Sequence, residues 1–135
     1  MNLFTPGWQG WSICESVVAL ACAAMVGAAV AAEPTPTARR EIEHLLSALE
    51  GSTCQFFRNG SWYSGKQARG HLQQKYDYLL KKGMISTAES FVDLGASTSS
   101  ASGKPYQVRC AGDAAPRLSA AWFTGELDKY RREGK

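Results

Sequence analysis

The chain has 135 residues, a length that suits one domain, and it carries a formal net charge of +3. Lys and Arg never occur in runs longer than two, so the sequence lacks the concentrated basic charge of a nucleic-acid-binding surface. A solvated surface of mixed sign is the simpler interpretation, and we predict no nucleic-acid partner.

The N-terminal residues 1–32 are predicted to be a signal peptide. No residue between Glu15 and Glu33 is charged, and this segment is rich in Ala and Val. The apolar run is short for a bilayer span, which needs about 20 residues, and its small residues suit cleavage after Ala32 or after Ala31. The part before the run lacks the Lys or Arg typical of signal peptides. An uncleaved anchor is therefore the alternative, and the membrane is then contacted only through this segment.

Removal of the signal peptide divides the remaining chain into three parts. Residues 33–37 are expected to form a short exposed leader, residues 38–132 a single domain and residues 133–135 a tail. The domain keeps two cysteines, Cys54 and Cys110. In an oxidising compartment they are expected to form a disulfide, and two buried free thiols are the alternative.

The first predicted helix covers about residues 38–50 and ends at Gly51. Its charged residues are expected on the solvent side, Glu41 among them. Apolar residues recur at helical spacing and predict one buried stripe, made of Ile42, Leu45, Leu46 and Leu49.

A β-hairpin followed directly by a helix is the strongest local pattern. The dipeptide Asn59-Gly60 favours a tight turn between strand 53–58 and a short second strand. This register pairs Phe57 with Trp62 and Phe56 with Tyr63. Ser64 then caps a helix over residues 65–81 with Gln67 as its capping-box partner.

Two further helices are predicted near the C-terminus. Ser86 and Glu89 have the spacing of a second capping box, which predicts a short helix that Gly95 ends. After a loop, Pro116 suits the first turn of a last helix that continues to about residue 132.

Residues 106–110 alternate apolar and polar side chains and predict a third strand. An antiparallel register that places Cys110 opposite Cys54 also places Val108 opposite Phe56, so one alignment satisfies both the sheet and the disulfide. We therefore predict an α+β fold, with a small antiparallel sheet of two or three strands packed with about four helices.

His71 is the candidate for acid–base catalysis, because an imidazole titrates near neutral pH. The sequence contains no motif that supplies its partners, so a structural histidine is the simpler interpretation. No pair of His or Cys residues has the close spacing of metal ligands, and we predict neither a metal nor a cofactor.

Four separated blocks carry a resemblance to a known family. They are Phe57-Arg58-Asn59-Gly60; Ala68, His71-Leu72 and Lys75; Thr87-Ala88-Glu89 with Phe91; and Ala96-Ser97, Ser99-Ser100 and Gly103-Lys104-Pro105-Tyr106. In this order they resemble the YfeK-like family of small exported bacterial proteins, a domain of unknown function. The resemblance implies export to the periplasm of a Gram-negative bacterium and implies no activity.

The residues of these blocks are unusually polar for a core. The simpler interpretation is that the serine hydroxyls cap chain turns and that Glu89 completes its capping box. The alternative is that the loop over residues 97–104 folds against the hairpin and the second helix, which forms a polar cleft for an acidic ligand or peptide terminus. The candidate ligand-binding residues are Arg58, Asn59, His71, Lys75, Ser97, Ser99, Ser100 and Tyr106.

Three functions remain open at this point. The first is a non-enzymatic periplasmic binding or accessory module whose partner is a small anionic ligand or an envelope protein. The second is a hydrolase that uses His71 as a base and a serine of residues 97–102 as a nucleophile. The third is an envelope interaction module that uses exposed aromatic residues such as Trp62 or Trp122.

Overall fold

The computed structural model describes residues 32–134. The predicted signal peptide, apart from Ala32, lies outside the described residues. Within the described range, no helix is both long enough and apolar enough to cross a membrane.

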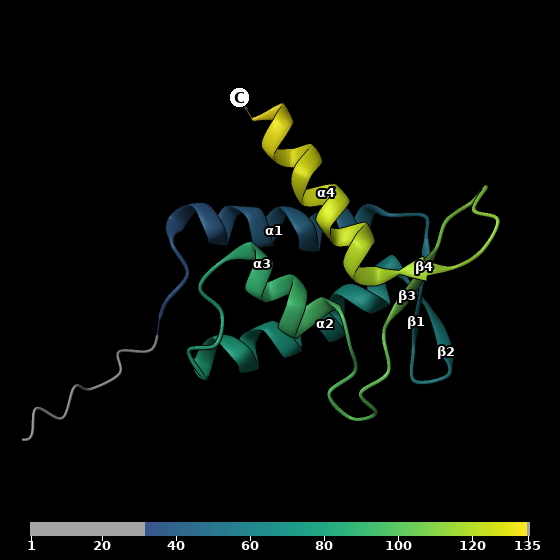
Figure 1. Cartoon of the computed structure of the whole chain (residues 1–135), viewed down its shortest axis with the longest axis horizontal. Coiled ribbons are helices and arrows are strands. Elements are labelled where there is room, and N and C mark those ends of the chain that lie inside the picture. Colours follow the sequence, from purple (N-terminus) through teal and green to yellow (C-terminus); the bar gives the residue numbers. More distant parts are fainter. Residues whose placement is uncertain (1–31, 135) are drawn as a thin grey trace, which may run out of the picture.

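The α+β fold is confirmed, and its helices gather on one side of a small sheet (Figure 1). In the described part of the chain, the elements in order are α1 (Pro36–Gly51), β1 (Gln55–Arg58), β2 (Ser61–Ser64), α2 (Gly65–Lys81), α3 (Ala88–Phe91), the π-helical turn η1 (Val92–Ala96), β3 (Gln107–Arg109), β4 (Arg117–Leu118) and α4 (Ser119–Glu133).

The sheet has four antiparallel strands in the order β2-β1-β3-β4, instead of the two or three predicted. The additional strand is β4, whose Leu118 pairs with Gln107 of β3. The prediction that the last helix starts at Pro116 is therefore wrong, because pairing with β3 keeps Arg117 and Leu118 extended. The helix α4 starts at Ser119 instead.

The predicted hairpin and the helix after it are confirmed. Asn59 and Gly60 have φ values of 49° and 88°, as a type I′ turn requires. The strands pair Phe57 with Trp62 and Phe56 with Tyr63. The predicted capping box between Ser64 and Gln67 is present, and α2 has the predicted bounds.

The strands β1 and β3 join distant parts of the chain in the predicted register. Phe56 pairs with Val108, and both are buried. The disulfide between Cys54 and Cys110 is present, with Cα atoms 4.2 Å apart and a sequence separation of 56 residues. The strand itself is shorter than predicted, since it covers residues 107–109.

The core lies between the inner face of the sheet and the four helices. The ring of Trp122 packs edge-on against both Phe56 and Phe123, and Phe91 packs edge-on against Phe123. Other fully buried residues of this core are Ile42, Leu45, Leu49, Ile85 and Val108.

Two helix starts differ from the prediction by a few residues. Helix α1 begins at Pro36 because the Oγ1 of Thr35 accepts a hydrogen bond from the Ala38 amide at 3.1 Å, so the predicted leader is partly helical. The capping box of α3 uses Thr87 and Ser90 instead of Ser86 and Glu89, so the predicted second box is wrong by one residue. Glu89 is thereby free for an ion pair.

The prediction that Glu41 faces solvent is wrong. Glu41 is buried, and its carboxylate accepts two hydrogen bonds from the guanidinium of Arg131 on α4, at 2.7 and 3.0 Å. A third bond at 2.7 Å joins Arg131 to Glu89. This bond is the largest cause of the lowered pKa of the Glu89 carboxyl, and a hydrogen bond from the backbone of Glu89 itself is the second largest. One guanidinium therefore ties the end of α4 to both α1 and α3.

Substitution Arg131→Ala should lower the free energy of unfolding by about 2 kcal/mol, because it leaves the Glu41 carboxylate buried without its partner. The expected loss is smaller than for a fully buried pair, since the Arg131 side chain is 40% exposed. Chemical denaturation of Arg131→Ala and of the adjacent, exposed Arg132→Ala measures the difference. Adding Glu41→Gln to Arg131→Ala should restore part of the loss. Equal losses in the two single variants would contradict the role of Arg131.

The lowered pKa of Glu89 adds stability that is present above the ordinary value of 4.5 and disappears on acidification.

Candidate functional site

A cavity of about 490 Å³ lies between α2, the hairpin and the loop of residues 97–106. We call it the hairpin cavity. Much of its wall consists of apolar side chains that also belong to the core or pack against it. These are Leu49, Phe56, Ala68, Leu72, Ala96 and Phe123.

Strand alternation places two polar residues at this cavity. Successive side chains of a strand point to opposite faces of the sheet, and the buried Phe56 and Val108 mark the inner face. Arg58 and Tyr106 lie two residues from these positions, so they share the inner face, and both line the cavity.

Helical spacing places a second set of residues there. Along α2, three residues follow Ala68 by three, four and seven positions: His71, Leu72 and Lys75. This spacing puts all four on one face of the helix. All four line the cavity. The helix begins directly after β2, so its first turns are held beside the inner face of the hairpin.

The loop of residues 97–106 forms the remaining wall and is held by its own backbone. The Ser99 amide donates to the Lys104 carbonyl at 2.9 Å, and the Tyr106 amide donates to the Ser97 carbonyl at 2.8 Å. A bridge between Thr98 and Pro105 continues this pattern. The loop is therefore a narrow hairpin of its own.

Two side-chain hydrogen bonds tie this loop to the rest of the site. The Lys75 ammonium donates to the carbonyl oxygen of Thr98 at 2.6 Å and lies 5.3 Å from the centre of the Tyr106 ring. The Ser102 hydroxyl donates to Oδ1 of Asn59 at 3.0 Å. The loop thus packs against both α2 and the hairpin, in the arrangement that the cleft hypothesis required.

Most of the candidate ligand-binding residues meet at the hairpin cavity, and two do not. Asn59 binds the loop through Ser102 instead of lining the cavity. The Ser97 hydroxyl donates to the Val92 carbonyl at 2.7 Å, which caps the turn η1. The residues that line the cavity are Arg58, His71, Lys75, Ser99, Ser100 and Tyr106.

The charged groups around the cavity have one sign. Arg58 and Lys75 line it, and among residues 32–134 no Asp or Glu does so. Neither Arg58 nor Lys75 forms an ion pair with a carboxylate in this part of the chain. Burial lowers the pKa of Lys75 most, and the nearby Arg58 guanidinium lowers it further. The site is therefore an apolar cavity with uncompensated positive charge.

The constellation expected for a hydrolase does not form. Within the described residues, His71 shares no hydrogen bond with any serine of residues 97–102, and its ring packs edge-on against Tyr63 at 5.4 Å. The Ser99 hydroxyl instead accepts hydrogen bonds from the amides of Ala101 and Ser102. A search of the same residues for groups of three or more His, Cys, Asp or Glu able to hold a metal finds none.

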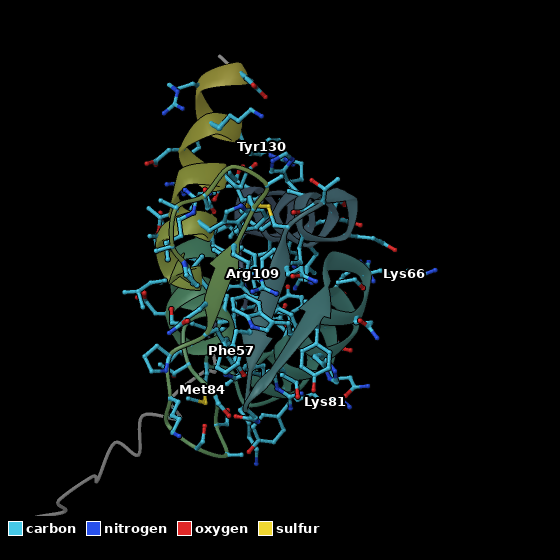
Figure 2. The ribbon with its side chains drawn as sticks, turned by 90° about the vertical axis from the view of Figure 1, so that its right-hand side faces the viewer. Phe57, Lys66, Lys81, Met84, Arg109 and Tyr130 are labelled. Atoms are coloured by element: carbon cyan, nitrogen blue, oxygen red, sulfur yellow. A yellow bond between two sulfur atoms is a disulfide. The ribbon has the colours of Figure 1, made fainter. Side chains whose placement is uncertain are left out.

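The two tryptophans proposed as exposed aromatic residues lie in different places. Trp122 is buried in the core, so its assignment to an interaction surface is wrong. Trp62 belongs to the outer face of the sheet, where the Arg109 guanidinium lies 4.1 Å from the centre of its ring. Figure 2 shows this outer face, with the labelled Arg109 and Phe57 upon it.

Several cavity residues were not among the candidates from sequence. Tyr63 could have been found, because the hairpin register places it beside Phe56 on the inner face. Gln74 and the exposed Tyr78 extend the α2 side of the cavity. Ser119 and Phe123 come from α4, and no local signal connects them with the hairpin.

Substitution Arg58→Gln should raise the pKa of Lys75, because it removes the neighbouring positive charge that helps to lower it. NMR titration of proteins with ¹³C-methylated lysines measures this pKa, and Lys75→Arg identifies the resonance. The matched control is Arg109→Gln, which removes the same charge from the outer face of the sheet. Equal Lys75 pKa values in Arg58→Gln and the unsubstituted protein would show that the two cations do not interact.

The comparison with family models gives one match. The model described as "Family of unknown function (DUF5329)" covers residues 36–131, which nearly coincide with the predicted domain. No match was found among curated proteins or among solved structures. A domain of unknown function, which the YfeK-like resemblance implied, is thus confirmed, although the matching family does not carry that name. The match spans most of the chain, from α1 to the ion-pairing Arg131, and the chain belongs to the DUF5329 family of unknown function.

Proposed function

We propose that this protein is a non-enzymatic binding module that holds a small anionic ligand in the hairpin cavity. The observation that carries the proposal is the pairing of an apolar cavity with Arg58 and Lys75, neither of which has a carboxylate partner in the described chain. Cations next to apolar walls attract an anion strongly, because the surrounding dielectric is low.

The geometry of the two cations supports the same proposal. Arg58 offers a planar set of donors that suits a carboxylate, phosphate or sulfate. The Lys75 ammonium uses one donor on the Thr98 carbonyl, which fixes its position and leaves two donors for a ligand. The exposed Ser100 lines the cavity and adds a hydroxyl that can donate to the same anion.

Dye binding tests the proposal directly. Anilinonaphthalene sulfonate, an anion with an apolar body, should bind the folded protein and fluoresce. Arg58→Gln should weaken its affinity at least tenfold, because a charged hydrogen bond contributes about 1.5–3 kcal/mol. The control Arg109→Gln should bind as the unsubstituted protein does, and circular dichroism checks that each variant is folded. Equal affinities in Arg58→Gln and Arg109→Gln would refute a site at Arg58.

We also propose that the protein is exported to the periplasm by residues 1–32. Two observations support this: the uncharged, Ala-rich segment before Glu33, and the disulfide between Cys54 and Cys110. Disulfides persist in oxidising compartments and are rare in the cytosol. The disulfide closes a long loop, so in the chain-entropy model it adds about 4 kcal/mol to the free energy of unfolding.

Cell fractionation tests the export proposal. The full chain should be recovered from the periplasm with a new N-terminus after Ala31 or Ala32 and with no titratable thiol. A form that starts at Glu33 should stay in the cytoplasm with both thiols reduced, and it should unfold at lower denaturant concentration. An intact precursor inside the cell with free Cys54 and Cys110 would contradict the proposal.

A further inference from the structure

The hairpin cavity changes character with depth. Its deepest residues are apolar and nearly inaccessible, as shown by exposed fractions of 1% for Leu49, 2% for Phe123 and 7% for Leu72. The residues that line it near solvent include polar side chains, among them the exposed His71 and Ser100. We call these two regions the floor and the mouth of the hairpin cavity.

All the positive charge lies at the mouth. Arg58 and Lys75 are half-buried, and among the described residues no charged side chain lines the floor. Two buried polar side chains also line the cavity, Ser99 of the loop and Ser119 of α4, and both are uncharged hydroxyls. A second ionic group on a ligand that reached the floor would have to lose its hydration without a charged partner, which costs several kcal/mol.

The volume of the hairpin cavity favours a ligand that is larger than a compact anion. A cavity of about 490 Å³ falls in the range that holds a whole small molecule. A phosphate or an acetate would occupy the mouth alone and leave the apolar floor in contact with water. An apolar body joined to the anion would cover that floor and gain the associated hydrophobic free energy.

We propose that the ligand is a single-headed amphiphile, namely a hydrocarbon chain that carries one anionic head. This inference rests on the proposed function and narrows it, because compact anions and acidic peptides with several charges are set aside. The head binds between Arg58 and Lys75, and the chain extends along Leu72 and Phe56 toward Leu49. A carboxylate head points to a free acyl chain and a phosphate head to a lipid phosphate, and the two heads share this recognition chemistry.

Displacement of bound anilinonaphthalene sulfonate by straight-chain carboxylates tests the inference. From butanoate through hexanoate and octanoate to dodecanoate, the affinity should rise about three- to fourfold per added methylene until the cavity is full. Alcohols of equal length should bind at least tenfold more weakly, because they lack the charge. Dodecyl phosphate beside dodecanoate identifies the preferred head, and tight binding of either one supports the inference.

Two variants test the floor and the mouth of the hairpin cavity independently. Ala68→Leu adds volume to the cavity wall on α2, where Ala68 is half-buried, and should reduce the gain per methylene while the affinity for butanoate stays the same. Arg58→Gln should remove the preference for carboxylates over alcohols and leave the gain per methylene unchanged. Thermal melts establish that both variants are folded.

The possible failures are distinguishable. Arg58-dependent dye binding with no dependence on chain length would overturn the amphiphile inference and leave the proposed function standing. Displacement by citrate and other compact polyanions in preference to dodecanoate would overturn it in the same way. Absence of Arg58-dependent dye binding would overturn both.

Discussion

The pairing of β1 with β3 is the constraint on which the rest of the structure depends. It is a contact between segments separated by about half of the described chain, and its register is fixed by Phe56 against Val108 on the buried face. A slip of β3 by one residue would turn Val108 toward solvent while Phe56 stays on the inner face, so the hydrophobic effect selects a single alignment. The disulfide between Cys54 and Cys110 lies just beyond the paired residues and holds the same alignment covalently.

This register also determines the position of the site. With Phe56 and Val108 facing inward, Arg58 and Tyr106 must face inward as well, and they do so at the end of the sheet where the hairpin turns. Helix α2 begins at Gly65 with no linker after β2, so Lys75 comes to the same end after about three helical turns. The hairpin cavity is therefore a consequence of one strand register and one uninterrupted strand-to-helix junction.

Patterns confined to short stretches were enough to predict much of this arrangement. The Asn59-Gly60 turn, the Ser64 cap and the bounds of α2 follow from turn chemistry and capping, which depend on a few neighbouring residues. The register of Phe56 with Val108 was also predictable, because the cysteines add a second condition to the alternation of the strand. These features depend only on neighbouring residues, or they are fixed by two independent conditions.

The features that sequence reasoning missed depend on partners far along the chain. Glu41 was assigned to the solvent side because it is charged, although its spacing from Leu45 places it beside the buried stripe. The partner that its carboxylate needs there, Arg131, lies 90 residues later. Pro116 has the signature of a helix start, yet Arg117 and Leu118 form β4 and pair with β3 instead. Phe123 reaches the hairpin cavity from α4 for the same reason, since tertiary packing overrides local propensity.

Features that lower stability are concentrated around the hairpin cavity. Arg58 and Lys75 repel each other and have no carboxylate partner in the described chain, and cavity volume remains unfilled above a well-packed core. The adjoining η1 departs from α-helical geometry, and π-helical turns of this kind often occur at functional sites. Elsewhere the fold is locally consistent: side chains cap the N-termini of α1, α2 and α3, the strand register is held twice, and Arg131 pairs two acids.

This contrast bears on the origin of the cavity. A fold selected for stability alone would fill part of the space beside Leu72 or place an acid next to Arg58. Natural proteins depart from local optimisation mainly where function requires it. The uncompensated cations and the open apolar floor therefore support a bound anion more strongly together than either feature does alone, because the same ligand accounts for both.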